Sequence, residues 1–87
     1  TLLEEGCSIG ANSTIICGNK VGKFSFVGAG SVVNRDIDNF ELVVGNPIRN
    51  IGWVNLEGEK LNFSKNNTIE SNGKTYNLSN NKVKIIK

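Results

Sequence analysis

Aliphatic residues recur at every sixth position over residues 3–33. The series is Leu3, Ile9, Ile15, Val21, Val27 and Val33. A helix with 3.6 residues per turn cannot keep positions six apart on one face, and a half-buried strand would be apolar at every second residue. A second series of small residues stands four places after the aliphatic positions: Cys7, Ser13, Asn19, Ser25 and Ser31. Two inward positions in every six residues predict a solenoid of short strands and tight turns.

Glycine directly follows several of the aliphatic positions, at Gly10, Gly22 and Gly28, where it suits a tight turn. Ile16 is an exception to this pattern. A β-rich segment with chance spacing would not carry two residue series in phase. The sequence therefore predicts an all-β fold that begins with a parallel β-helix of hexapeptides.

The six-residue period stops after Trp53, and short stretches of alternating apolar and polar residues follow. Asn72-Gly73 separates two such stretches, and this dipeptide is typical of a two-residue hairpin turn. Further turns are expected at Asn66-Asn67 and Asn80-Asn81. The pattern predicts an antiparallel meander of two to four strands that covers the open end of the solenoid. We expect coils over 1–38, a loop, strand and turn over 39–53, and the meander over 54–87.

Composition excludes several classes of protein. The net charge is +2 and the basic residues are scattered, which argues against nucleic-acid binding. The chain has no histidine and only two cysteines, Cys7 and Cys17, so no metal site is expected. Cys7 falls in the small inward series and is interpreted as a packing residue. No apolar run is long enough to cross a membrane, and the free cysteines favour a cytoplasmic location.

Two segments resemble a known family. VGAGSVVNRDI (27–37) and LVVGNPIRNIGWV (42–54), together with the period, resemble the bacterial hexapeptide-repeat acyltransferases. The resemblance is strongest to the branch that N-acetylates nucleotide-linked amino sugars for surface polysaccharides, and the tail GEKLNF…GKTYNL (58–78) resembles the extension of that branch. It implies a left-handed parallel β-helix with 18 residues per coil and a homotrimer. It also implies acetyl-CoA as acyl donor in a groove between subunits, and a nucleotide-sugar substrate near the thiol end.

Residues 3–38 give only two coils of 18 residues, whereas a stable solenoid needs about three repeats. The chain starts at Thr1 and contains no methionine. We therefore expect further coils upstream of Thr1, and we expect these residues to be ordered chiefly as a trimer or beside such coils.

Ala11 and Ala29 are the first candidate cofactor-binding residues. They are 18 residues apart and lie in glycine-rich surroundings. In the family, the alanine that matches Ala29 presents its backbone to pantetheine, whose amide groups suit backbone hydrogen bonds. The alternative is that both alanines are merely small turn residues.

Asn34, Arg35 and Arg49 are the candidates for the nucleotide end of the cofactor. The family has polar and basic residues at the positions of Asn34 and Arg35, and Arg49 is the basic residue of its GNPxR motif. A guanidinium suits phosphate because its planar fork offers two parallel donors. Both arginines are also compatible with a solvated surface. Asp38 and Ile48 depart from the proline and alanine that are usual in the family.

The catalytic group is unknown from the sequence. Acetyl transfer to an amine benefits from a base, and the family often uses a histidine that this chain lacks. Glu4 and Glu5 are candidates only by elimination, with a solvated charged edge as the alternative. The resemblance implies an N-acetyltransferase, with a non-catalytic trimeric scaffold or binding module as the alternative. The hexapeptide carbonic anhydrases are disfavoured because they need three histidine ligands.

Overall fold

The computed structural model describes residues 2–63, 67–80 and 82–86. These residues form strands and turns, and they contain no helix that could cross a membrane. The strands are β1 (Leu2–Leu3), β2 (Ser8–Ile9), β3 (Thr14–Ile15), β4 (Lys20–Val21), β5 (Phe26–Val27), β6 (Val32–Val33), β7 (Glu41–Val44), β8 (Arg49–Val54), β9 (Lys60–Leu61), β10 (Thr68–Ser71), β11 (Lys74–Ser79) and β12 (Lys82–Ile85).

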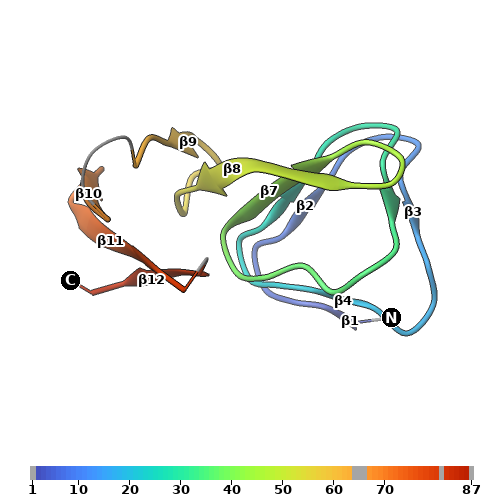
Figure 1. The fold of residues 1–87 in the computed structure, drawn as a ribbon, viewed down its shortest axis with the longest axis horizontal. Helices are drawn as coiled ribbons and strands as arrows, with labels where there is room; N and C mark the ends of the chain where they lie inside the picture. Colours follow the sequence, from blue (N-terminus) through green and yellow to red (C-terminus); the bar gives the residue numbers. More distant parts are fainter. Residues whose placement is uncertain (1, 64–66, 81, 87) are drawn as a thin grey trace.

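Three parallel sheets of two-residue strands form the sides of a triangular coil (Figure 1). The sides are β1 with β4, β2 with β5, and β3 with β6. In each pair a residue lies beside the residue eighteen positions later, as Ile9 lies beside Val27. The parallel coil expected from the six-residue period is therefore present in the described residues.

A shortened third coil lies over the first two. Val21 is bridged to Ile37, and Val27 lies beside Val43, so the repeat here is sixteen residues rather than eighteen. After Val44 the chain reverses at a turn, and β8 pairs antiparallel with β7. Within residues 2–63, no strand forms a third side of this coil, because β8 turns back along β7 and pairs antiparallel with it.

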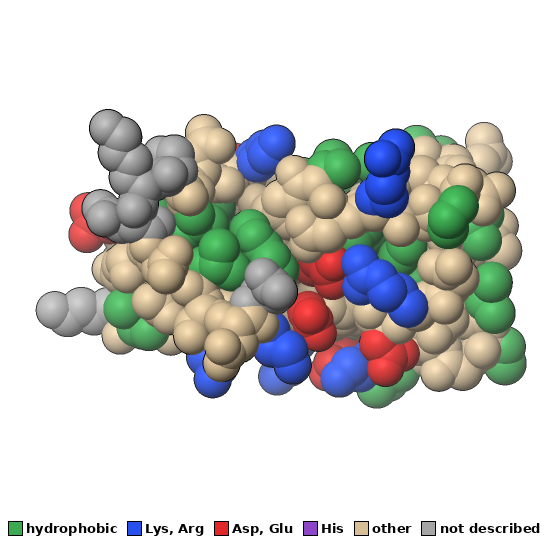
Figure 2. Space-filling model, in the orientation of Figure 1, with side chains coloured by type: hydrophobic (Ala, Val, Ile, Leu, Met, Phe, Trp, Pro, Cys, Tyr) green, Lys and Arg blue, Asp and Glu red, His purple; other side chains and the backbone are tan. Residues whose placement is uncertain are grey.

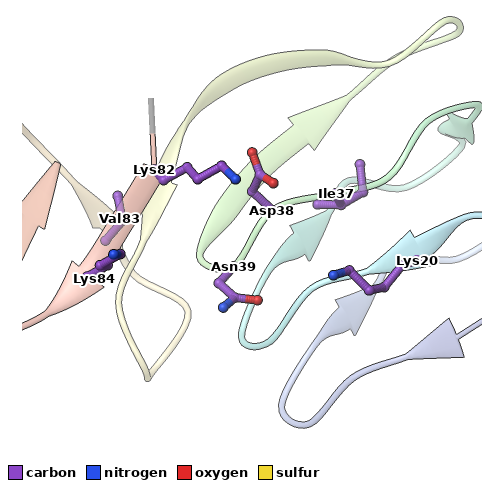
Figure 3. A pocket seen from close by; sticks show the side chains of 7 residues that line it. All are labelled: Lys20, Ile37, Asp38, Asn39, Lys82, Val83 and Lys84. Carbon is purple, nitrogen blue, oxygen red and sulfur yellow. The ribbon is translucent and has the colours of Figure 1, made fainter. Parts of the chain in front are cut away.

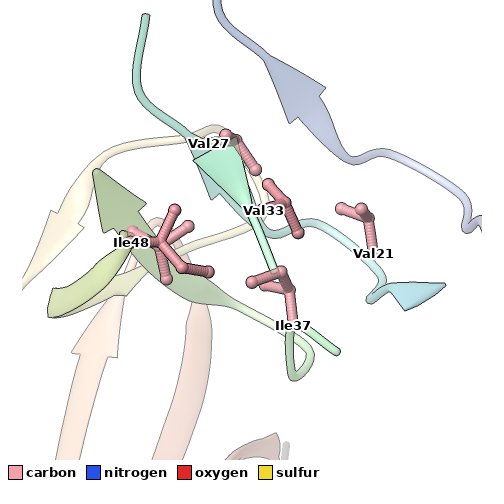
Figure 4. Close-up of a cluster of buried hydrophobic side chains, with 6 residues drawn as sticks. Val21, Val27, Val33, Ile37 and Ile48 are labelled. Carbon is pink, nitrogen blue, oxygen red and sulfur yellow. The ribbon is translucent and has the colours of Figure 1, made fainter. Parts of the chain in front are cut away.

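Aliphatic side chains from Ile9 onward fill the bore of the coils. Val21, Val27, Val33, Ile37 and Ile48 point toward one another in Figure 4, and together with Val43 they form one buried cluster. Each fully buried valine or isoleucine contributes roughly 1.5–3 kcal/mol. Ile9 and Ile15 pack against this cluster but are only partly buried, because they belong to the first coil.

The small inward residues satisfy the turns. The hydroxyls of Ser25 and Ser31 are buried and donate to the carbonyls of Gly22 and Gly28, at 2.8 and 2.6 Å. Each hydroxyl thus returns a hydrogen bond to the turn three residues before it. Gly22 is needed for a different reason: a Cβ there would lie 2.6 Å from the carbonyl oxygen of Ile37 in the next coil.

The tail is the predicted antiparallel meander. Strands β10, β11 and β12 pair in order, and β9 continues the sheet of β7 and β8. The predicted Asn72-Gly73 hairpin is confirmed, with both residues at positive φ (50° and 81°). Asn66 and Asn81, expected in two further turns, lie outside the described residues.

Aromatic residues join the tail to the last coils. Tyr76 on β11 is fully buried with Phe40, Leu61 and Val83, and Phe24 packs against this cluster. The buried Tyr76 hydroxyl accepts a hydrogen bond from the N–H of Leu56 at 3.1 Å. The division of the chain at residues 38 and 53 remains a prediction.

Candidate functional site

Ala11 and Ala29 occupy the same corner of successive coils. Both residues are exposed, and the N–H of Gly30 donates to the carbonyl of Ala11 at 2.9 Å. A Cβ on Gly10 would collide with the backbone of Ala29, so glycine is required for the two turns to stack closely. Within the described residues, the N–H and carbonyl of Ala29 have no hydrogen-bond partner.

The Gly45-Asn46-Pro47 turn continues this corner in the third coil. The N–H of Val32 donates to the carbonyl of Gly45 at 3.0 Å, and the N–H of Gly45 donates to the Ser31 hydroxyl at 3.1 Å. The structure therefore brings Ala11, Ala29 and the GNP turn together, although the turn lies 16 or more residues further along the chain. The surface that they share is called the alanine corner below.

Arg49 lies beside a hollow at the end of the alanine corner. The hollow has a volume of about 450 Å³ and is lined by Val44, Gly45, Asn46, Pro47, Arg49, Asn50 and Ile51. Arg49 is exposed, and among the described residues no carboxylate lies within ion-pair distance of its guanidinium. The arginine predicted from GNPxR is thus accessible to a ligand. Ile48, which replaces the usual alanine, is buried in the core cluster.

Asn34 and Arg35 lie at the next corner, on the far side of β6 from Ala29. Asn34 is exposed. The guanidinium of Arg35 is paired with Glu41: its two terminal nitrogens donate to the carboxylate at 3.3 and 2.8 Å. This hydrogen bond raises the pKa of Arg35. The two predicted arginines therefore differ: the charge of Arg35 is paired with a carboxylate, and that of Arg49 is not paired among the described residues.

Glu41 is a buried residue that the sequence interpretation missed. It is 3% exposed, and besides Arg35 it accepts hydrogen bonds from the Asp38 N–H and the Asn50 side chain, both at 2.9 Å. Burial alone would raise the pKa of Glu41, but these hydrogen bonds outweigh burial and lower it. Glu41 also lines a hollow of about 320 Å³ with Asp38, Asn50 and Trp53.

The remaining candidates lie in the first coil. Glu4 and Glu5 are in the turn after β1, and the Glu4 carboxylate lies 3.8 Å from the Lys20 ammonium. Cys7 packs against the core cluster, as predicted, whereas Cys17 is exposed. Among the described residues no group of three or more histidine, cysteine or acidic side chains could hold a metal ion.

Charged side chains gather near the middle of one face, between the coils and the tail (Figure 2). A smaller hollow of about 160 Å³ lies there, with Lys20 from β4 on one side and Lys82 and Lys84 from β12 on the other (Figure 3). Asp38 and Asn39 lie between them, so this hollow is of mixed charge.

Known acetyltransferases are similar to this chain in sequence and in structure. No family model matches the chain. It is 35% identical, with a TM-score of 0.55, to a serine acetyltransferase solved in complex with CoA, over 56% of this chain and 21% of that one. It is also 33% identical to serine acetyltransferase 4 of Arabidopsis thaliana, over 78% of this chain and 19% of the relative. The chain therefore resembles the hexapeptide-repeat acetyltransferases, as its sequence motifs predict.

A particular relative belongs to the amino-sugar branch. It is the dTDP-3-amino-3,6-dideoxy-alpha-D-galactopyranose 3-N-acetyltransferase of Aneurinibacillus thermoaerophilus, which is 47% identical over 76 residues. The match covers 87% of this chain and 40% of the relative. The chain thus spans about two fifths of the length of this enzyme, and the resemblance to the amino-sugar branch is confirmed.

Proposed function

We propose that the chain forms part of an acetyl-CoA-dependent N-acetyltransferase that acts on a nucleotide-linked amino sugar. The observation that carries the proposal is the alanine corner, where two coils and the GNP turn present small residues beside the accessible Arg49. The 47% identity to a dTDP-amino-sugar N-acetyltransferase supports the acceptor class. The likeness to a serine acetyltransferase in complex with CoA supports the donor.

The alanine corner fits the pantetheine arm of acetyl-CoA. The arm carries amide groups, and the backbone N–H and carbonyl of Ala29 are free to hydrogen-bond with them among the described residues. Ala11 is exposed at the same corner one coil away, and a side chain larger than methyl at either alanine would stand in the path of the arm. When bound, acetyl-CoA would supply the acetyl group as a thioester.

Arg49 and Asn34 would serve the nucleotide end. The exposed guanidinium of Arg49 can form two parallel hydrogen bonds with a phosphate. Asn34 offers an amide at the neighbouring corner. Arg35, predicted with them, has its charge paired with Glu41, and its role is taken up below.

We also propose the family's assembly for this chain: a left-handed coil in a cytoplasmic homotrimer, with the cofactor groove between neighbouring subunits. Exposed large apolar side chains are compatible with contacts to other subunits or coils, since Leu2, Leu3, Ile16 and Ile51 are each about half exposed. Analytical ultracentrifugation checks the trimer, and a monodisperse monomer would contradict it.

The experiment that tests the function is an acetyl-transfer assay with acetyl-CoA and a panel of dTDP- and UDP-linked amino sugars. Release of the CoA thiol and a product heavier by one acetyl group are expected for at least one sugar. Release of the thiol without acetylated sugar would be hydrolysis only, and would contradict the proposal. Saturable CoA binding with no transfer to any sugar would favour the non-catalytic scaffold. The reason to consider this alternative is that the chain contains no histidine.

A further inference from the structure

Arg35 and Glu41 stand at places of the repeat that hold small residues in the preceding coil. In the second coil, Asn19 stands two residues before Val21 and Ser25 two before Val27, and both are small inward residues. In the third coil, Arg35 stands two residues before Ile37 and Glu41 two before Val43. The register pairs Val21 with Ile37 and Val27 with Val43, so Arg35 and Glu41 replace Asn19 and Ser25 one coil further on.

The Arg35 side chain is 44% exposed at this place. The Glu41 carboxylate is nonetheless almost fully buried, and a buried carboxylate must be paired and hydrogen-bonded. Arg35 supplies two donors, Asp38 its backbone N–H and Asn50 its side-chain amide. Four donors saturate the two carboxylate oxygens.

This network fixes the strand that carries Arg49. From β8, the side-chain amide of Asn50 donates to Glu41, and the side-chain Oδ1 of Asn50 accepts a hydrogen bond from the N–H of Gly52 at 3.0 Å. Arg49 directly precedes Asn50 in the strand and lies opposite Val44 in the β7–β8 pairing. The hydrogen bond that fixes Asn50 therefore also fixes the adjoining backbone of Arg49, which lines the hollow.

Arg35 is a poor free cation by the same geometry. Both terminal nitrogens are bonded to Glu41, and one also donates to the Asp36 carbonyl at 2.9 Å. A phosphate that took Arg35 would leave the buried Glu41 charge uncompensated, which is costly. Arg49 meets no such competitor among the described residues.

We propose that Glu41 is a positioning residue: it holds Asn50, and through it Arg49, in place for the phosphate of the cofactor, while Arg35 neutralises Glu41. This inference rests on the proposed function.

The test compares the affinities for CoA and for 3′-dephospho-CoA, since their ratio reports the phosphate contact alone. Isothermal titration is made with the native protein and four variants: Arg49→Met, Arg35→Met, Glu41→Gln and Asn50→Ala. Arg49→Met and Arg35→Met are a matched pair, because the same side chain replaces each cation. We expect the two affinities to become equal in Arg49→Met, so that their ratio falls to one. Glu41→Gln and Asn50→Ala should each reduce it about threefold or more, and Arg35→Met should leave most of it.

Each contrary result overturns the proposal in a recognisable way. If the affinity ratio falls to one in Arg35→Met and stays native in Arg49→Met, Arg35 is the phosphate contact. A ratio raised by Glu41→Gln would show that Arg35 binds phosphate once freed. A native ratio in Glu41→Gln and Asn50→Ala, with only stability changed, would make the network purely structural. If Glu41→Gln does not fold, Asn50→Ala decides, since Asn50 is exposed.

Failure of the proposed function looks different. In that case the native protein binds neither nucleotide, while the network can still be detected by thermal unfolding. A double-mutant cycle of Arg35→Met and Glu41→Leu should then still show coupling between the two residues.

Discussion

The ring of Phe40 lies parallel to the ring of Phe24, with centroids 5.7 Å apart and planes inclined by 14°. The two residues occupy the same turn of successive coils, and both have positive φ (62° and 55°). Phe40 also contacts the tail, because the ring of Tyr76 packs edge-on against it with ring centroids 5.8 Å apart. A short aromatic column therefore couples the coils to the meander.

Phe40→Ala should destabilise the coils and the tail together. Truncating a buried phenylalanine costs roughly 3–5 kcal/mol. Because Phe40 contacts both parts, we expect one cooperative transition at lower urea concentration rather than separate unfolding of the tail. Far-ultraviolet circular dichroism and Trp53 fluorescence should follow the same curve. Two separated transitions in the native protein would show that the column does not couple the parts.

Tyr76→Phe isolates the polar contact of the same column. The ring is kept, but the Leu56 N–H loses its acceptor at 3.1 Å. A lost hydrogen bond of this kind costs roughly 1–3 kcal/mol when the partner stays buried. Urea unfolding should report a loss in that range, and the m-value should not change. An unaltered midpoint would mean that water replaces the hydroxyl.

Much of the coil could be predicted from the sequence because its side-chain rule is local. Every sixth residue from Ile9 to Val33 packs in or against the buried core for the same steric reason, and Asn72-Gly73 is a dipeptide that readily adopts positive φ. The third coil was harder to recognise. The period is two residues shorter between Val33 and Ile37, so the equivalence of Arg35 with Asn19 and of Glu41 with Ser25 can be recognised only once the register is known.

The candidate site also has a part that could be predicted from local sequence and a part that could not. Ala29 and Arg49 could be chosen from motifs because each lies exposed at its own turn. The pairing of Arg35 with Glu41 joins two corners of an incomplete coil, and no local pattern predicts it. Continuing the small inward series past the shortened repeat is the signal that could have found Glu41.

Acid should weaken the fold through Glu41. The pKa of Glu41 is lowered in the folded state from its ordinary value of 4.5, so this residue stabilises the protein above pH 4.5. That contribution is lost as the pH falls through the lower folded pKa. The difference in melting temperature between the native protein and Glu41→Gln should therefore shrink from pH 7 toward pH 3. The comparison is needed because hydrogen bonds from Asn55 and Asn72 also lower the pKa of Glu59. A constant difference across this range would show that ionised Glu41 is not what stabilises the fold.

Ala29→Leu should impair cofactor binding without unfolding the protein. Ala29 is exposed, so the larger side chain projects from the alanine corner into the proposed path of pantetheine. We expect the affinity for acetyl-CoA to fall about tenfold or more, which corresponds to roughly 1.4 kcal/mol. The melting temperature should stay close to that of the native protein. Lys74→Leu is the matched control, since it places the same side chain at an exposed position of the tail. Equal affinities in both variants would remove Ala29 from the site.

The most direct measurement is isothermal titration of the native protein with acetyl-CoA, because every assignment above depends on that ligand. We expect saturable binding that is weakened by Ala29→Leu and by Arg49→Met but not by Lys74→Leu. The absence of heat at millimolar acetyl-CoA, from a protein that is folded by circular dichroism, would contradict the proposal that the alanine corner is a cofactor site.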